Sequence, residues 1–118
     1  YMNRLVMVQN YNAVTAACLL MKKEDFIKVE GFDEVNFKVG LNDIDLCLKL
    51  REIGKFNVLT PYAELYHYES LTRGSDEKGE SRKRFEKECK MFRAKWKKYF
   101  ESIDEYTNPN FECEVVQL

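Results

Sequence analysis

The clearest structural signal in the sequence is the stretch L-N-D-I-D-L-C-L-K-L-R-E-I-G, which runs from Leu41 to Gly54. Its apolar residues fall on two flanks of a helix, and Asn42 or Asp43 can cap the start. Gly54 stands where a helix usually ends. We therefore expect a helix that begins at Asn42 or Asp43 and carries two apolar flanks.

The residues before this helix predict a strand, a short helix and a loop. The apolar run A-V-T-A-A-C-L-L-M at 13–21 is typical of a strand buried on both faces, although its periodicity alone does not exclude a buried helix. Residues 24–30 predict a short helix that stops at Gly31. Residues 32–40 carry several acidic and amide side chains and favour a loop.

The residues after the helix predict two strands, a polar loop and a long helix. Residues 56–59 and 63–68 favour strands on either side of a Thr-Pro break, and 73–80 favours a mobile loop because it is polar and contains two glycines. From 81 to 100, apolar residues recur at intervals of four, three, four and three positions, which indicates one apolar stripe on a charged helix. The stripe consists of Phe85, Cys89, Phe92, Trp96 and Tyr99.

The composition is that of one globular domain. The 118-residue chain is 45% hydrophobic and 33% charged, and its 19 basic and 20 acidic residues nearly cancel. This balance excludes a disordered chain and disfavours a nucleic-acid partner, and no apolar run approaches the roughly 18 residues of a membrane span. We therefore expect a single α/β domain over 1–118, with a small mixed sheet and flanking helices. Residues 75–118 would supply a mobile loop, a long basic amphipathic helix and a tail.

The cysteine pattern disfavours both a zinc site and a disulfide framework. The four cysteines are far apart in the sequence, no C-x-x-C pair occurs, and the chain has one histidine. A structural zinc site needs closer pairs, and reduced cysteines in apolar runs behave as small hydrophobic residues. The pattern fits a reducing cytosol.

The acidic pair Asp43 and Asp45 has a spacing that is compatible with a metal site. If both residues open a helix, however, their side chains point about 200° apart around its axis. One carboxylate can then face a cleft while the other caps the helix or packs. The same geometry disfavours a small acid-dependent hydrolase that uses both carboxylates, and it leaves a capped helix start open as the structural alternative.

Two further groups of residues could carry chemistry. His67 leaves a predicted strand towards a glycine-containing loop, and Arg73 on that loop could hold a phosphate or a carboxylate. Gly31 permits a close backbone approach, beside which Phe32 could form the wall of a pocket. Each of these residues also has a purely structural explanation. His67 could be a packed histidine, Arg73 a surface arginine, and Gly31 with Phe32 a helix stop with an apolar anchor.

Taken in order, six motifs resemble the C-terminal half of bacterial family 2 glycosyltransferases. They cover nearly the whole chain, and the ordered set is far more specific than any one motif. The motifs are N-A-V-T-A-A-C-L-L at 12–20, G-F-D-E at 31–34, L-N-D-I-D-L-C-L-K-L-R at 41–51, T-P-Y-A-E-L-Y-H-Y-E-S at 60–70, R-G at 73–74 and Y-T-N-P-N-F at 106–111.

The resemblance implies the A-type glycosyltransferase (nucleotide-diphospho-sugar transferase) fold, in which a nucleotide-binding α/β half precedes an acceptor half built around a mixed sheet. This chain resembles the acceptor half and lacks the N-terminal nucleotide-binding half with its metal-binding D-x-D. The family transfers a sugar from a nucleotide-sugar donor to a saccharide acceptor with inversion, usually with Mg²⁺ or Mn²⁺. The resemblance therefore implies a bacterial enzyme of cell-envelope polysaccharide biosynthesis, in the cytoplasm or at the inner face of the membrane.

The resemblance also implies a role for each candidate residue. Asp43 matches the carboxylate that acts as the base, since an acceptor hydroxyl must lose its proton as it attacks the anomeric carbon. The other assignments are acceptor binding by Gly31, Phe32, Asp33 and Asn42, donor binding by Arg73, and metal contact by His67. Three residues depart from the family pattern, namely Asn42 in place of an acid, Glu30 in place of a first glycine, and Lys49 in place of an arginine.

The missing donor half has a physical consequence. We expect the 118-residue fragment to be inactive by itself, to hold no cofactor, and to self-associate through an unpaired sheet edge and an uncovered apolar face. The alternative is a non-catalytic interaction module that docks through the aromatic stripe of the C-terminal helix. In that case Phe92 and Trp96 would be essential, whereas Asp43 and His67 would be replaceable.

Overall fold

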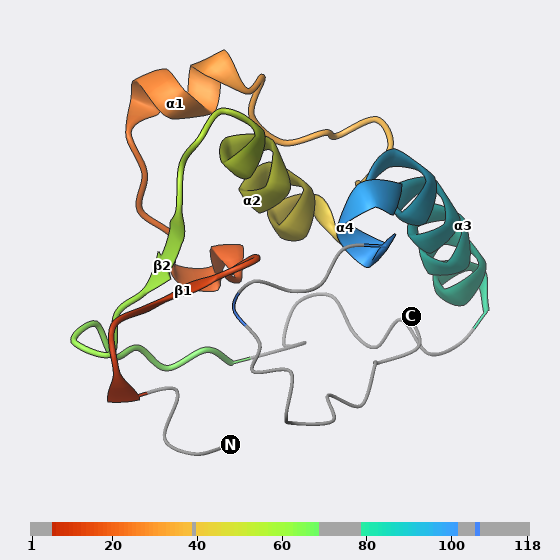
Figure 1. Cartoon of the computed structure of the whole chain (residues 1–118). Coiled ribbons are helices and arrows are strands. Elements are labelled where there is room, and N and C mark those ends of the chain that lie inside the picture. Colours follow the sequence, from red (N-terminus) through yellow and green to blue (C-terminus); the bar gives the residue numbers. More distant parts are fainter. Residues whose placement is uncertain (1–5, 39, 69–78, 102–105, 107–118) are drawn as a thin grey trace.

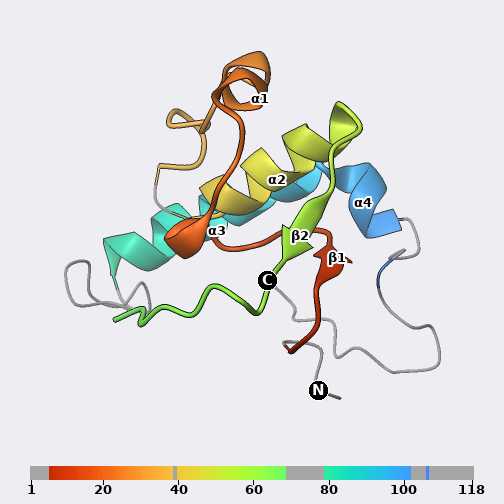
Figure 2. The same ribbon diagram turned by 90° about the vertical axis from the view of Figure 1, so that its left-hand side faces the viewer.

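The computed structural model describes residues 6–38, 40–68, 79–101 and 106, which form a small α/β fold (Figure 1). A two-stranded antiparallel sheet lies beside a group of helices (Figure 2). In chain order the elements are β1 (Gln9–Tyr11), a short 3₁₀ helix (Ala16–Cys18), α1 (Lys23–Lys28), α2 (Asn42–Glu52), β2 (Asn57–Leu59), α3 (Glu80–Lys95) and α4 (Lys97–Glu101).

The helix α2 lies between the other helices, with α1 on one side and α3 and α4 on the other (Figure 1). It contributes to two apolar clusters, so the prediction of two apolar flanks is confirmed. The buried residues of the cluster towards α3 are Phe37, Leu41, Leu48, Cys89, Phe92 and Trp96, and those of the cluster towards α1 are Val29, Leu46 and Leu50. Packing from both sides therefore fixes the rotation of α2 about its axis.

The two ends of α2 differ in how they match the expectation. At the C-terminus Gly54 has φ +77°, and the last turn closes with the backbone hydrogen bonds of a Schellman motif, as its position predicted. At the N-terminus the cap position is held by Leu41, with φ +63° and no side-chain cap. The prediction that Asn42 or Asp43 caps the helix is therefore wrong, because burial of the leucine side chain in the cluster towards α3 decides the geometry there.

The strand predicted at 56–59 is confirmed as β2. It pairs antiparallel with β1, so that Gln9 lies opposite Leu59 and Tyr11 opposite Asn57. The expected mixed sheet is not found, because within the described residues the sheet consists of these two antiparallel strands.

The strand predicted over 13–21 is wrong. The Thr15 hydroxyl accepts a hydrogen bond from the N–H of Ala17 at 3.3 Å, and this local bond begins the 3₁₀ helix in place of a strand. Leu20 is 97% exposed, so the apolar run is not buried on both faces. The strand predicted at 63–68 is also wrong, because in the part of the chain that the structure describes this segment has no neighbouring strand with which to pair.

The long C-terminal helix is confirmed, but it is divided at Trp96 into α3 and α4. Its apolar stripe faces α2, and Phe92 and Trp96 are only 3% and 5% exposed. These side chains are therefore not available as a docking surface, and the interaction-module alternative loses its basis. Most of the predicted loop at 73–80 and nearly all of the tail after residue 101 lie outside the described residues.

The three cysteines among the described residues are free thiols in different environments. Cys47 and Cys89 are buried, and burial raises the pKa of both thiols. Cys18 is exposed, so the expectation that it packs as a small hydrophobic residue is wrong. Among the described residues, no helix has the length and apolar character that crossing a bilayer requires.

Candidate functional site

The loop between α1 and α2 begins with two consecutive residues in the left-handed conformation. Glu30 and Gly31 have φ +60° and +59°, and the N–H groups of both bond back to the end of α1. A Cβ atom on Gly31 would lie 2.7 Å from the ring of Phe26, so glycine permits this close approach. The turn carries Phe32 and Asp33 to the edge of a pocket.

This pocket has a volume of about 520 Å³ and is formed by the loop together with α2 and α3. Its lining residues are Glu30, Phe32, Asp33, Glu34, Val35, Asn36, Lys49 and Lys95. One aromatic ring among carboxylate, amide and ammonium groups is a set that suits a polyhydroxylated ring. The C–H face of such a ring can pack on the aromatic side chain, and its hydroxyls can form hydrogen bonds with the polar groups of the pocket.

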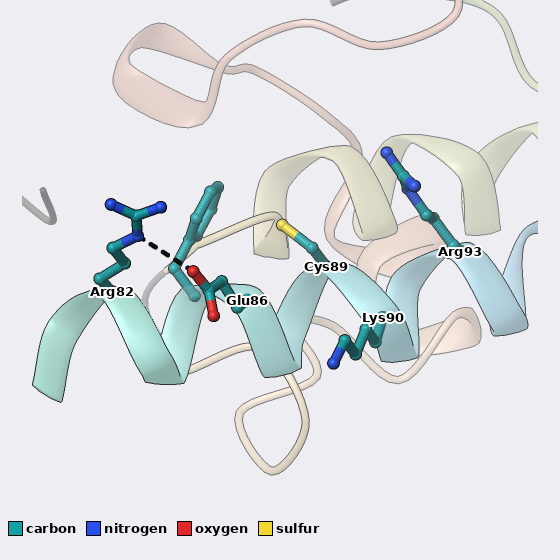
Figure 3. A pocket seen from close by; sticks show the side chains of 6 residues that line it. Arg82, Glu86, Cys89, Lys90 and Arg93 are labelled. Atoms are coloured by element: carbon teal, nitrogen blue, oxygen red, sulfur yellow. Dashed lines mark hydrogen bonds and ion pairs between the residues drawn. The ribbon is translucent and has the colours of Figure 1, made fainter. Parts of the chain in front are cut away.

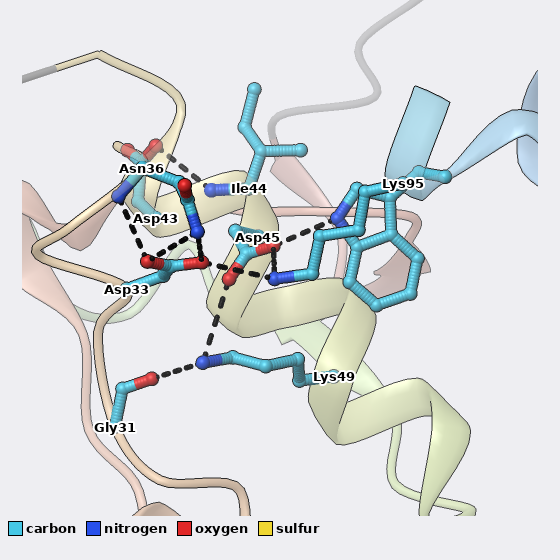
Figure 4. A network of polar contacts seen from close by, with 9 residues as sticks. Gly31, Asp33, Asn36, Asp43, Ile44, Asp45, Lys49 and Lys95 are labelled. Atoms are coloured by element: carbon cyan, nitrogen blue, oxygen red, sulfur yellow. Dashed lines mark hydrogen bonds and ion pairs between the residues drawn. The ribbon is translucent and has the colours of Figure 1, made fainter. Parts of the chain in front are cut away.

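The carboxylate of Asp33 fixes the shape of the loop. It accepts hydrogen bonds from the backbone N–H and the side-chain amide of Asn36 at 3.0 and 2.9 Å (Figure 4). The hydrogen bonds of Asn36, with a further contribution from the ammonium of Lys95, lower the pKa of Asp33 from 3.8 to about 2 against the opposing effect of burial. Asp33 is therefore charged at neutral pH.

Asp45 forms the buried centre of the polar network in Figure 4. Its side chain is fully buried, yet its carboxylate is paired with the ammonium groups of Lys95 at 2.7 Å and Lys49 at 3.4 Å. The indole N–H of Trp96 also donates a hydrogen bond to the Asp45 carboxylate, at 2.8 Å. Lys49 also donates to the carbonyl of Gly31, so the network joins α2 to both α3 and the loop.

The carboxylate of Asp43 faces a different side of α2 from Asp45. It accepts hydrogen bonds from the backbone N–H groups of Ala16 at 3.3 Å and Ile44 at 2.9 Å, and its side chain is half-buried. The prediction that the two carboxylates diverge is therefore confirmed. A hydrolase that uses both is ruled out, since Asp45 is sealed from solvent and neutralised by lysines.

The structure brings together some of the predicted site residues and not others. Gly31, Phe32 and Asp33 lie in one turn, which lines the pocket through the last two. Asn42 is half-buried in the first turn of α2 and, like Asp43, is not among the residues that line the pocket.

The two residues assigned to the donor and the metal lie after β2. His67 is exposed in a segment without regular structure, and Arg73 lies outside the described residues. Within the described ranges, no group of three histidine, cysteine, aspartate or glutamate side chains is arranged to hold a metal ion. The described residues alone therefore do not supply a complete set of metal ligands around His67.

A second pocket, of about 380 Å³, lies on α3 (Figure 3). It is lined by Arg82, Phe85, Glu86, Cys89, Lys90 and Arg93. Arg82 and Glu86 pair at 3.0 Å across one helical turn on the surface, as such i, i+4 pairs do. None of the predicted site residues reaches this pocket.

Sequence reasoning missed Lys95 as a site residue. In the sequence it is one of many cations on a basic helix, and nothing marks it as different from its neighbours. Trp96 did carry a signal, because the N–H of a buried indole needs an acceptor. That signal requires a buried acceptor, but it does not identify Asp45 as the acceptor.

The chain is similar to proteins that are much longer than itself. It is 47% identical over 114 residues to an uncharacterized protein, y4gI, of Sinorhizobium fredii, a match that covers 97% of this chain and 12% of the relative. It is 38% identical over 68 residues to the O-antigen biosynthesis protein RfbC of Myxococcus xanthus. This match covers 58% of this chain and 5% of the relative.

A third relative has an enzyme name. The chain is 35% identical over 63 residues to an N-acetylglucosaminyl-diphospho-decaprenol L-rhamnosyltransferase of Mycobacterium tuberculosis, which covers 53% of this chain and 20% of the relative. No family model and no solved structure matches the chain. The chain thus has a distant, partial homology to glycosyltransferases, and it spans no more than a fifth of the length of these three relatives.

Proposed function

We propose that this chain is the acceptor side of an inverting family 2 glycosyltransferase, which moves a sugar from a nucleotide donor to a hydroxyl of a saccharide. The partial similarity to a rhamnosyltransferase and to an O-antigen biosynthesis protein supports the reaction class. In this proposal the nucleotide-sugar donor is bound largely by residues outside this 118-residue sequence. The enzyme would serve the synthesis of a cell-envelope polysaccharide.

The observation that carries the proposal is the environment of Asp43. Two backbone N–H groups hold its carboxylate at the first turn of α2, and the side chain remains half-buried. A carboxylate has about four acceptor positions, so two remain for an acceptor hydroxyl. Held in this way, Asp43 removes the proton as the hydroxyl oxygen attacks the anomeric carbon and the bond to the leaving diphosphate breaks.

The pocket beside the loop has a separate task in this proposal. Because Asp43 faces another side of α2, the sugar residue in the pocket is not the one whose hydroxyl reacts. The pocket would hold a neighbouring residue of the acceptor chain, packed on Phe32 and hydrogen-bonded by Asn36. This arrangement favours an oligosaccharide or lipid-linked saccharide acceptor over a free monosaccharide.

The test is the substitution Asp43→Asn in the complete enzyme that the proposal implies. Donors are first identified by calorimetric titration with a panel of sugar nucleotides and Mn²⁺. Asparagine keeps an oxygen for the Ala16 N–H but does not take up the proton, so turnover should fall about 10²–10⁴-fold while donor affinity stays unchanged. The matched control is Asp25→Asn, which removes another half-buried carboxylate, one that pairs with Lys55 at 3.1 Å.

A variant Asp43→Asn that turns over at the rate of the unmodified enzyme would exclude Asp43 as the base. A requirement for a divalent metal, and a contact of His67 with that metal, remain separate predictions. They are tested by loss of donor binding on chelation and in His67→Ala.

A further inference from the structure

We propose that α3 is the positioning element of the candidate site. Lys95 holds the loop of residues 31–36 against α2, and Glu88 holds the backbone that leads into Asp43. The inference rests on the proposed function for its meaning, but its geometry can be tested without any transferase assay. It assigns a task to two residues of a helix that itself supplies none of the predicted site residues.

The first arm of this arrangement is the ammonium of Lys95. It lies 2.7 Å from a carboxylate oxygen of Asp45 and 3.3 Å from one of Asp33. Asp45 is fixed within α2, whereas Asp33 belongs to the loop that carries Phe32. One cation between two carboxylates removes their mutual repulsion and joins the loop to the helix. Without it, Lys49 alone among the described residues is left to pair with Asp45 and to join the loop to α2.

The second arm is the carboxylate of Glu88, which is only 4% exposed. It accepts a hydrogen bond from the N–H of Gly40 at 3.0 Å, directly ahead of Leu41. A Cβ atom on Gly40 would lie 2.9 Å from the ring of Phe85, so α3 can approach the backbone this closely because the residue is glycine.

This contact acts at a strained point of the chain. Leu41 has φ +63°, a left-handed conformation that is costly for a residue with a side chain. Such a conformation persists when its surroundings hold it, and here the leucine packs in the cluster between α2 and α3 while Glu88 holds the preceding residue. Asp43 follows two residues later, so a shift of this backbone moves the proposed base.

The two arms belong to one face of α3. Glu88 and Lys95 are seven residues apart, which is close to two helical turns, so their side chains lie above one another. Phe92, between them, packs in the cluster with α2. A single rigid helix therefore fixes the loop at one place and the start of α2 at another.

The test uses the 118-residue chain and NMR. Lys95→Met should raise the pKa of the Asp33 carboxyl, followed by its ¹³C resonance, and should shift the amide resonance of Asn36, while Lys95→Arg restores both. Because Asn36 also lowers this pKa, the rise should be partial. The matched control is Lys97→Met, whose ammonium pairs with Glu101 at 3.4 Å on the surface and should leave both signals unchanged.

Folding of the variants is kept separate from positioning. Lys95→Met leaves the buried charge of Asp45 less neutralised, which can prevent folding. In that case the double variant Lys95→Met, Asp45→Asn removes both charges, and the pKa of the Asp33 carboxyl is measured in that variant. For the second arm, Glu88→Ala should shift the amide resonance of Gly40, and Glu88→Gln, which keeps an acceptor oxygen, should reverse that shift.

A binding measurement distinguishes this inference from the proposed function. Neutral methyl pyranosides are titrated into the unmodified chain and into Lys95→Met, and the amide resonances of the loop are followed. If the unmodified chain binds a pyranoside and Lys95→Met, with an altered loop, does not, both proposals are supported. An altered loop without pyranoside binding by either chain supports the positioning role and contradicts the acceptor pocket. If Asp33 and Asn36 are unchanged in a folded Lys95→Met, the positioning role of Lys95 is overturned.

Discussion

Glu30 occupies a backbone conformation that favours glycine, and it does so at the entrance to the candidate pocket. Its φ of +60° places it in the left-handed region, where the Cβ atom of an L-residue costs roughly 1–2 kcal/mol. A glycine is common at this position in the glycosyltransferases that the sequence resembles, and in this chain the glutamate takes up the left-handed backbone there. The neighbouring Gly31 has the same conformation without that cost.

Replacing this residue tests whether the strain is stored in the folded state. Glu30→Gly should stabilise the chain by about 0.5–1 kcal/mol, since the relief of strain exceeds the extra entropy of glycine in the unfolded state. Thermal unfolding should show a rise of about 2–5 °C in Tm. Glu34→Gly is the control, since Glu34 is exposed without a positive φ, and it should not stabilise. A Tm that is equal in both variants would argue against strain at Glu30.

Single residues also show what the sequence could and could not predict about the site. The divergence of Asp43 and Asp45 followed from helix geometry alone, because both lie in one element. The pairing of Asp45 with Lys95 did not, because the two residues are 50 positions apart and depend on how α3 packs. Contacts within an element are predictable from spacing, whereas contacts between elements require the tertiary fold.

At the scale of elements, helices were predicted better than strands. Apolar spacing and the glycines at 31 and 54, which act locally, located α2 and placed α1 to within two residues, since the helix predicted over 24–30 spans Lys23–Lys28. The apolar run 13–21 had no such local marker against a strand, and the structure has a 3₁₀ helix there, begun by a hydrogen bond from the N–H of Ala17 to the hydroxyl of Thr15. A strand also needs a partner, which the sequence of the strand itself does not supply.

The contact between α2 and α3 contains a buried hydrogen bond whose contribution to the free energy of unfolding can be measured. The indole N–H of Trp96 donates to the buried carboxylate of Asp45 at 2.8 Å. Trp96→Phe keeps an aromatic ring but leaves that carboxylate with one donor fewer, which should cost about 1–3 kcal/mol. Urea unfolding followed by circular dichroism gives the free energy of unfolding.

A matched control comes from α4, where the hydroxyl of Tyr99 donates to Glu52 at 2.6 Å on the surface. Tyr99→Phe also deletes one donor to a carboxylate, but water can replace it, so the loss should stay below about 1 kcal/mol. Equal losses in the two variants would mean that burial of Asp45 contributes nothing to the value of its hydrogen bond.

At the scale of the whole molecule, the described residues leave one apolar surface open beside the sheet. We call Leu20, Phe56 and Val58 the β2 patch, since all three line one pocket next to β2. Their exposed fractions are 97%, 69% and 50%. A two-stranded sheet with an open apolar neighbour is a marginal structure in water, and such a patch usually contacts another protein surface.

We expect the 118-residue chain to self-associate through the β2 patch. Light scattering after size exclusion should give a mass that rises with concentration, and the double variant Leu20→Ser, Phe56→Ser should lower it because it removes apolar area from the patch. Tyr62→Ser is the matched control, since Tyr62 is 89% exposed but lies outside the patch. A monomer at every concentration would contradict self-association, and an equal effect of the control would show that general apolar exposure, rather than this patch, drives it.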